Sequence, residues 1–171
     1  MADPAPATVI HLIPHHGIGG VGVAAAHMAR GDLPDPQVRG MPLLPAPGLG
    51  FAAQLSALVR GVITLRRDSP DLLIVSLWRS YLVALILKLL RPRQRIVLFV
   101  HSTIEMHWPD RWLTRLVYRL SDAVWADCSA SLAARLPGKA QGSIISYRIE
   151  RWTRLTARPP RPDFIFWGRL S

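Results

Sequence analysis

Short apolar runs recur along the chain, and segments with helical periodicity separate them. Strands are predicted at residues 8–13, 72–76, 95–100, 123–126 and 142–147, and a weaker strand candidate lies at 38–44. A strand covered on both faces has this pattern, because it meets apolar groups on either side. We therefore expect an α/β fold with a Rossmann-like parallel sheet, right-handed crossovers and helices on both faces.

Helices are predicted between most of these strands. They cover residues 21–30, 51–67, 81–90, 112–120 and 129–136. In the second of them, Leu55, Leu58, Val59, Val62 and Ile63 lie on one side, a pattern that predicts an amphipathic helix. The last helix begins at a serine, a residue type suited to cap a helix N-terminus.

The character of the sequence changes after residue 147. Residues 148–162 are rich in arginine and proline, which predicts an exposed basic linker. A new apolar strand is predicted at 163–167, and the sequence ends at Ser171. We interpret residues 1–147 as one Rossmann-like lobe and 163–171 as the first strand of a truncated second lobe. The alternative is a last strand that completes the first sheet.

The charge balance favours anionic partners. There are 21 Lys+Arg against 11 Asp+Glu, and because only two of the basic residues are lysines, most of the surplus is arginine, which suits bidentate contact with phosphate. An arginine-rich surface that only keeps an apolar chain soluble is equally open. The single cysteine excludes an internal disulfide and fits a reducing compartment.

No secretory signal is visible, and the most apolar stretch, at 81–90, is shorter than the roughly 20 residues that a spanning helix needs. We expect a cytoplasmic protein. Peripheral contact with the inner face of the membrane stays open, because both the apolar content and the basic charge are compatible with it.

A glycine loop follows the first predicted strand. Gly17, Gly19, Gly20 and Gly22 satisfy G-x-G-x-x-G, and glycines there let backbone amides approach an anion at a helix N-terminus. A dinucleotide-binding loop is disfavoured, because residues 14–16 lengthen the turn and the second strand ends without a carboxylate for the ribose. We prefer a loop that approaches phosphate or sugar. The alternative is a glycine turn that is needed only for close packing of the helix on the sheet.

His101 comes directly after the fourth strand and is followed by Ser102. Parallel sheets bind ligands at the carboxyl ends of their strands, so His101 can orient a substrate, transfer a proton or contact a sugar, although a structural role is equally open. Together with His15, His16 and Glu105 it could suggest a metal site. No ligand spacing supports one, and we expect no metal.

Aromatic residues are less informative. Trp78 and Arg79 follow the third strand, within reach of the same edge of the sheet. Trp108, Trp112, Trp125 and Trp152 are interpreted as packing residues, since tryptophan is more often buried than ligand-binding. No G-x-S-x-G elbow is present, so the sequence gives no support to a serine hydrolase.

The order of these segments resembles the retaining glycosyltransferases of family 4, which have the two-lobed GT-B fold. The similarity lies in the Gly19-Gly20 loop, in residues 99–102, in residues 122–131 and in Phe164–Ser171. The last segment is similar to the opening strand and turn of that family's nucleotide-sugar-binding lobe. The resemblance implies an N-terminal, acceptor-side lobe. It further implies transfer from a nucleotide sugar to a glycan or lipid-linked acceptor with retention, in surface polysaccharide or glycolipid synthesis.

The resemblance also assigns roles. His101 would contact the transferred sugar, Gly19 and Gly20 would approach the donor diphosphate or the acceptor, and Arg169 would begin a diphosphate clamp. Neither a cofactor nor a metal ion is implied. The family's Asn-Gly pair is missing at 145–150, and the lysine expected soon after Arg169 is absent. We expect negligible transferase activity from this chain alone.

Two other functions stay open. One is an NAD-type Rossmann oxidoreductase, and the other is a non-enzymatic module that binds membranes or anions through its arginines. No recognised nucleic-acid-binding motif is present, so a nucleic-acid partner is not expected.

Overall fold

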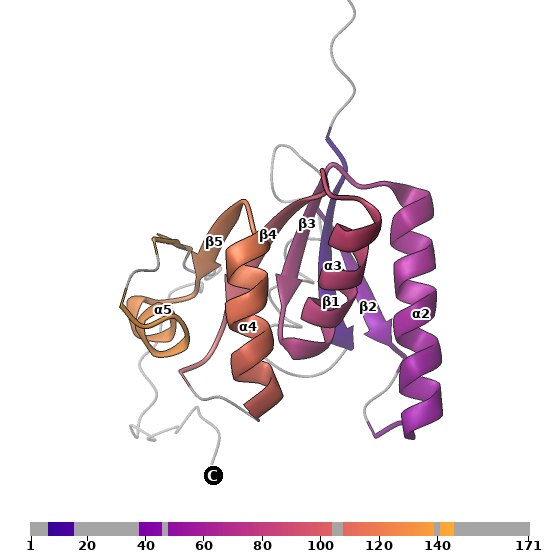
Figure 1. Ribbon diagram of the computed structural model, residues 1–171, viewed down its shortest axis with the longest axis horizontal. Helices are drawn as coiled ribbons and strands as arrows, with labels where there is room; N and C mark the ends of the chain where they lie inside the picture. The colour runs from indigo at the N-terminus through magenta and orange to yellow at the C-terminus, as the bar shows by residue number, and fades with distance from the viewer. Residues whose placement is uncertain (1–6, 16–37, 46–47, 104–107, 139–140, 146–171) are drawn as a thin grey trace, which may run out of the picture.

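The computed structural model describes residues 7–15, 38–45, 48–103, 108–138 and 141–145. Six strands form one sheet in the order β2-β1-β3-β4-β5-β6, and every neighbouring pair is parallel (Figure 1). The strands are β1 (Val9–His15), β2 (Val38–Leu44), β3 (Leu72–Ser76), β4 (Arg95–Val100), β5 (Ala123–Ala126) and β6 (Ser143–Ile144). The prediction of a Rossmann-like parallel sheet is confirmed.

Four helices are described, and they pack on the same face of this sheet. They are α2 (Phe51–Asp68), α3 (Trp78–Leu90), α4 (Trp108–Leu120) and α5 (Ser129–Arg135). In Figure 1, α2, α3 and α4 lie beside one another in front of the strands, and α5 lies at the β5 edge. Among the described helices, none has both the length and the apolar character that a membrane crossing requires.

Alternate residues of the central strands form two separate apolar layers. Leu73, Val75 and Leu98 point toward the described helices and belong to the larger core. Ile74 and Phe99 point to the opposite face, where they form a smaller cluster. Because both layers are apolar, β3 and β4 carry the uninterrupted apolar runs that the sequence shows.

Two helices begin earlier than predicted. Helix α3 starts at Trp78 rather than residue 81, and Ser80 Oγ donates hydrogen bonds to the carbonyl oxygens of Ser76 and Leu77 in its first turn. Helix α4 starts at Trp108 rather than residue 112. A proline and Asp110 follow Trp108, and both are favoured in a first helical turn.

Other boundaries shift by smaller amounts. Helix α5 is capped by Cys128, whose Sγ accepts a hydrogen bond from the Ser131 amide, so the prediction of Ser129 as the cap is wrong. Strand β1 runs to His15, beyond the predicted end at residue 13, and β6 is shorter than its predicted range.

The helix predicted at 51–67 is confirmed as α2, but the apolar side named from the sequence is only partly buried. The helix buries Ala57, Gly61, Val62 and Leu65 against the sheet, and three of the predicted apolar positions face outward instead. Gly61 explains the close packing, since a Cβ there would lie 2.7 Å from Leu43 Cδ2 of β2.

A buried ion pair fastens α5 to α4. Arg135 Nη2 donates to Asp110 Oδ1 at 2.6 Å and to Thr114 Oγ1 at 3.0 Å. Both charged side chains are almost fully buried, at 3% and 5% exposed. Burial of a charge is costly unless it is paired, so the two residues depend on each other.

Several predicted segments lie outside the described residues. They are the helix at 21–30, the glycine loop, the linker at 148–162 and the strand at 163–167. The boundary at residue 147 and the truncated second lobe therefore stay predictions.

Candidate functional site

A polar cluster crosses three neighbouring strands near the carboxyl edge of the sheet. In the β1–β3 register His11 lies opposite Ile74, and Ser76 comes two residues further along β3. In the β3–β4 register Ser76 lies opposite Phe99, and His101 comes two residues further along the chain. Since residues two apart in a strand share a face, His11, Ser76 and His101 form a diagonal on the face of the smaller apolar cluster.

Hydrogen bonds join the three side chains. His11 Nε2 lies 2.8 Å from Ser76 Oγ, and Ser76 Oγ lies 3.1 Å from His101 Nε2. His11 and Ser76 are fully buried, whereas His101, at 7% exposed, is the member nearest solvent. The Phe99 ring lies beneath both imidazoles, with ring centroids 4.0 Å from His101 and 6.2 Å from His11. The cluster therefore runs from the core to the rim of the sheet.

The hydrogen-bonding capacity of the groups favours one direction of donation. His11 Nδ1 is buried and has no hydrogen-bond partner among the described residues. Because an unpaired buried N–H is rarer than an unpaired acceptor, the His11 proton is best placed on Nε2, which then donates to Ser76 Oγ. The Ser76 hydroxyl is left to donate to His101 Nε2. In this arrangement Ser76 and His11 fix the orientation and the tautomer of the His101 ring.

Burial keeps both histidines neutral. Desolvation and, as a smaller cause, the nearby His101 together lower the pKa of His11 from 6.5 to about 4. Desolvation also lowers the pKa of His101 to about 4, although the Asp127 carboxylate acts in the opposite direction. At neutral pH, His101 is thus a neutral hydrogen-bonding group and a weak base.

Strained backbone flanks the cluster on two adjacent strands. Leu77, directly after Ser76, has φ 68° and ψ 156°, a region that is almost exclusive to glycine. Ser102, directly after His101, has φ 74°. Left-handed backbone at non-glycine residues is uncommon and concentrates at functional sites. These two residues follow the ends of two neighbouring strands, which supports a site at the carboxyl edge.

Other polar residues line the same edge. Asp127 follows β5, and its Oδ1 is buried without a hydrogen-bond partner among the described residues. Arg79, in the first turn of α3, donates from Nη2 to Gln54 Oε1 at 3.1 Å and lies over the Trp78 ring, 4.7 Å from its centroid. Trp78 and Arg79 are therefore held against each other and against α2.

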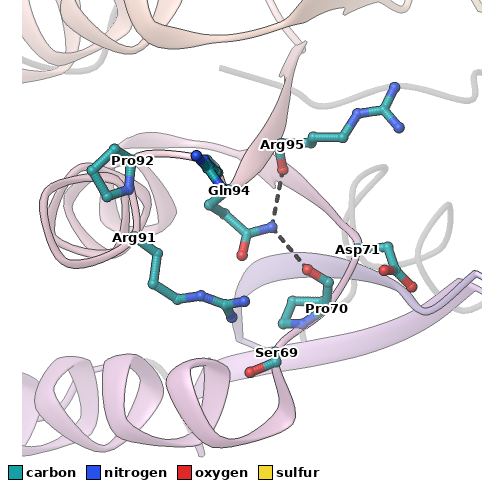
Figure 2. Close-up of a pocket in the computed structure, with 8 residues that line it drawn as sticks. Ser69, Pro70, Asp71, Arg91, Pro92, Gln94 and Arg95 are labelled. Carbon is teal, nitrogen blue, oxygen red and sulfur yellow. Dashed lines mark hydrogen bonds between the residues drawn. The ribbon is translucent and has the colours of Figure 1, made fainter.

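A pocket at the opposite edge of the sheet is a weaker candidate. Figure 2 shows it between the segments that precede β3 and β4. Its volume of about 590 Å³ would admit a small molecule. Gln94 Nε2, however, is already bonded to the carbonyl oxygens of Pro70 and Arg95 and holds these two segments together. Five strand residues of about 3.3 Å each separate Asp71 from Ser76, so this pocket lies roughly 16 Å from the cluster.

The burial of Ser76 excludes one reaction of the cluster. Ser76 has the partners of a catalytic serine but is fully buried, so its hydroxyl cannot attack a substrate from solvent. Among the described residues, no group of three or more His, Cys, Asp or Glu could hold a metal ion. The oriented, neutral imidazole of His101 is suited to recognition of a polar ligand.

The predicted site residues have different outcomes. His101 and Ser102 lie together at the carboxyl edge, as predicted, although their contact with substrate stays a prediction. The loop with Gly17, Gly19, Gly20 and Gly22, together with Arg169, lies outside the described residues. The interpretation of Trp108 and Trp112 as packing residues is wrong, because they are 83% and 61% exposed.

Sequence reasoning missed His11 and Ser76. Each interrupts or ends an apolar strand, and that was the available signal: a histidine inside such a run requires a buried partner. Their partner could not be identified, because the pairing depends on the register between strands that are more than 60 residues apart in the sequence.

No protein-family model and no curated protein sequence matches the chain. Its fold is similar to that of solved structures. HepE from Anabaena, determined in complex with UDP and glucose, matches with a TM-score of 0.59 and 15% sequence identity, over 84% of this chain and 45% of HepE. This likeness shows a shared fold.

Two UDP-GlcNAc 2-epimerases are less similar. The enzyme from Methanocaldococcus jannaschii matches with a TM-score of 0.46 at 11% identity, over 75% of this chain and 42% of the enzyme. The enzyme from Neisseria meningitidis, bound to UDP-GlcNAc, matches with a TM-score of 0.49 at 11% identity, over 75% and 41%. The chain spans less than half the length of each of these three proteins.

Proposed function

We propose that this chain forms the acceptor-side lobe of a GT-B glycosyltransferase, which transfers a sugar from a nucleotide-sugar donor to a glycan or lipid-linked acceptor. The observation that carries the proposal is the His11–Ser76–His101 cluster, which presents an oriented imidazole at the carboxyl edge of a parallel sheet. Ligands of such sheets bind at that edge. The shared fold with HepE, which was solved with UDP and glucose, supports the same assignment.

His101 acts in this proposal as a hydrogen-bonding contact to the transferred sugar. Because His101 Nε2 accepts from Ser76, the neutral ring carries its proton on Nδ1, which can donate a hydrogen bond to a sugar hydroxyl oxygen. Since the pKa of His101 is about 4, it is too weak a base to deprotonate an acceptor at neutral pH. His101 therefore contributes by positioning the sugar. Ser76 and His11 in turn position the His101 ring.

The remaining parts of the site follow the family resemblance. Gly17, Gly19, Gly20 and Gly22 would approach phosphate or sugar, and Arg169 would begin a diphosphate clamp, with Ser102 beside His101. A departing diphosphate needs cations and amide groups aimed at it, and arginine and backbone amides supply them without a metal ion or cofactor. Transfer with retention, a cytoplasmic location and a role in surface polysaccharide or glycolipid synthesis belong to the same proposal.

The test is a binding panel with the complete protein that carries this chain. Calorimetric titrations with UDP, UDP-glucose, UDP-GlcNAc, GDP-mannose and NADH compare nucleotides and nucleotide sugars with a dinucleotide cofactor. We expect one nucleotide sugar to bind at least about tenfold more tightly than NADH. NMR of the product then gives its anomeric configuration, which the proposal expects to match that of the donor. Preferential binding of NADH would overturn the transferase in favour of an oxidoreductase.

A further inference from the structure

The large apolar side chains that are exposed gather on one layer of the molecule. Eleven are exposed among the described residues, and ten of them belong to α2, α3 or α4. The ten are Phe51, Leu55, Val59, Ile63, Ile86, Leu89, Leu90, Trp108, Trp112 and Leu120. Scattered exposed hydrophobic residues are normal, but their concentration on neighbouring helices marks an interaction surface. We call this surface the outer helical face.

Helix α2 contributes a regular stripe to the outer helical face. Phe51, Leu55, Val59 and Ile63 are spaced four residues apart and are 82%, 51%, 51% and 61% exposed. Side chains at this spacing follow one another along a helix. The fold leaves them exposed, because other residues of α2, among them Ala57, Gly61 and Leu65, supply its buried contacts. The helix is thus apolar on the side that packs inward and on the side that faces outward.

Helix α4 contributes two exposed tryptophans, Trp108 and Trp112. Tryptophan carries an apolar ring and a polar N–H, a combination that suits the boundary between water and lipid headgroups. The helix follows β4, so both tryptophans lie toward the carboxyl edge of the sheet that carries His101. Helix α3 lies between α2 and α4 (Figure 1). It adds three exposed apolar side chains to the surface.

The exposed charges of the three helices are almost all positive. Six exposed arginines belong to them: Arg60, Arg66, Arg67, Arg111, Arg115 and Arg119. Within these helices the carboxylates are Asp68, which pairs with Arg39, and Asp110, which is buried with Arg135. An apolar surface bordered by arginines, with its carboxylates already paired, is complementary to a layer of anionic headgroups above acyl chains.

We propose that the outer helical face binds the surface of an anionic lipid bilayer. The charge argues against a second copy of the chain as the occupant, because a symmetric dimer would bring arginines against arginines. The same positive charge favours an anionic bilayer, whose headgroups supply phosphate. The bilayer interior would accept Phe51 and the two tryptophans. The binding is peripheral and is independent of the transferase activity proposed above.

The experiment is co-sedimentation of the complete protein with phosphatidylcholine vesicles, with and without phosphatidylglycerol. We expect binding at least about tenfold tighter to the anionic vesicles, and a fall in binding as salt rises. The W108S/W112S variant should bind about tenfold more weakly. The R115Q/R119Q variant should lose about tenfold or more on anionic vesicles and show a weaker salt dependence.

Two controls separate a local surface from general charge or stickiness. R93Q/R95Q removes two exposed arginines outside the helices, and I144S removes the exposed large apolar residue outside the outer helical face. Both should bind like the wild type, and all variants should keep the wild-type circular dichroism. Absence of binding to anionic vesicles would overturn the proposal. So would equal losses in variants and controls, or sedimentation of a dimer that W108S/W112S disrupts.

Discussion

Acidification should destabilise the folded protein through its two buried histidines. An unfolded histidine takes up a proton near pH 6.5, whereas folded His11 and His101 have pKa values of about 4. Protons therefore bind the unfolded state first, and the stability contributed by the neutral imidazoles is complete above about pH 6.5 and falls as the pH drops toward 4. Between about pH 7.5 and about pH 5, the expected loss is about 2 kcal/mol per histidine, or roughly 4 kcal/mol for the pair.

Urea denaturation at the two pH values measures this loss. Wild type and the H11Q/H101Q variant are compared, since glutamine keeps a polar amide but does not titrate. The variant should be less stable at neutral pH, and its free energy of unfolding should change much less with pH than that of the wild type. Carboxylates remain mostly ionised at about pH 5, so the difference between the two proteins isolates the histidines.

NMR titration of the imidazole signals gives the pKa values directly. The single variants H11Q and H101Q each remove one signal and so assign it to its residue. Midpoints near 6.5 for both rings, together with equal pH dependence of wild type and double variant, would refute the reasoning. The inference that His101 is neutral and is oriented by Ser76 would then fail as well.

Three further substitutions test the packing around the site, each by urea denaturation. Ser76→Ala should lower the free energy of unfolding by about 2–5 kcal/mol because two buried imidazole nitrogens lose their partner, while the equally buried control Ser80→Ala should cost only about 1 kcal/mol; similar costs for both would contradict the cluster. Asp110→Ala should cost about 3–5 kcal/mol by leaving Arg135 charged and buried, and the apolar pair D110L/R135M should recover much of that loss; a pair no better than D110A would exclude the ion pair as the cause. Leu77→Gly should raise the free energy of unfolding by roughly 1 kcal/mol by relieving the positive φ, whereas Leu77→Val should lower it; the reverse order would show that the backbone there is not strained.

The central strands could be predicted from the sequence because their signal is local. Residues 72–76 and 95–100 are apolar at every position or nearly so, and a strand with helices or apolar layers on both faces requires this. Their neighbours along the chain are helical, so the parallel order follows from the handedness of the crossovers. The observed bounds of these two strands match the predicted ones.

Helix orientation and the site itself could not be predicted in the same way. Periodicity placed apolar residues on one side of α2, but it does not say which of two apolar sides meets the sheet. That choice depends on Gly61, which lets the helix approach Leu43 closely. His101 was found because it ends a strand, whereas His11 and Ser76 are identified only by a register that brings distant strands together.

The outer helical face shows how an exposed residue is misread from sequence. The general burial of tryptophan favours a packing role for Trp108 and Trp112, yet both are exposed. Helix α4 turns its buried residues, among them Leu113 and Val117, toward the sheet. The periodicity of Leu113 and Val117 fixes the inward side of the helix, and Trp108 and Trp112 lie away from it.

The most direct test of the central claim is the rate of sugar transfer by the complete protein. Steady-state kinetics with a labelled nucleotide sugar compare wild type, His101→Ala and the neighbouring exposed control Thr103→Ala. Each variant is first shown to be folded by circular dichroism. The account predicts measurable transfer by the wild type, a loss of about 10- to 100-fold in kcat/KM for H101A, and wild-type kinetics for T103A. Wild-type kcat/KM in folded H101A, or hydride transfer from NADH with no sugar transfer, would contradict it.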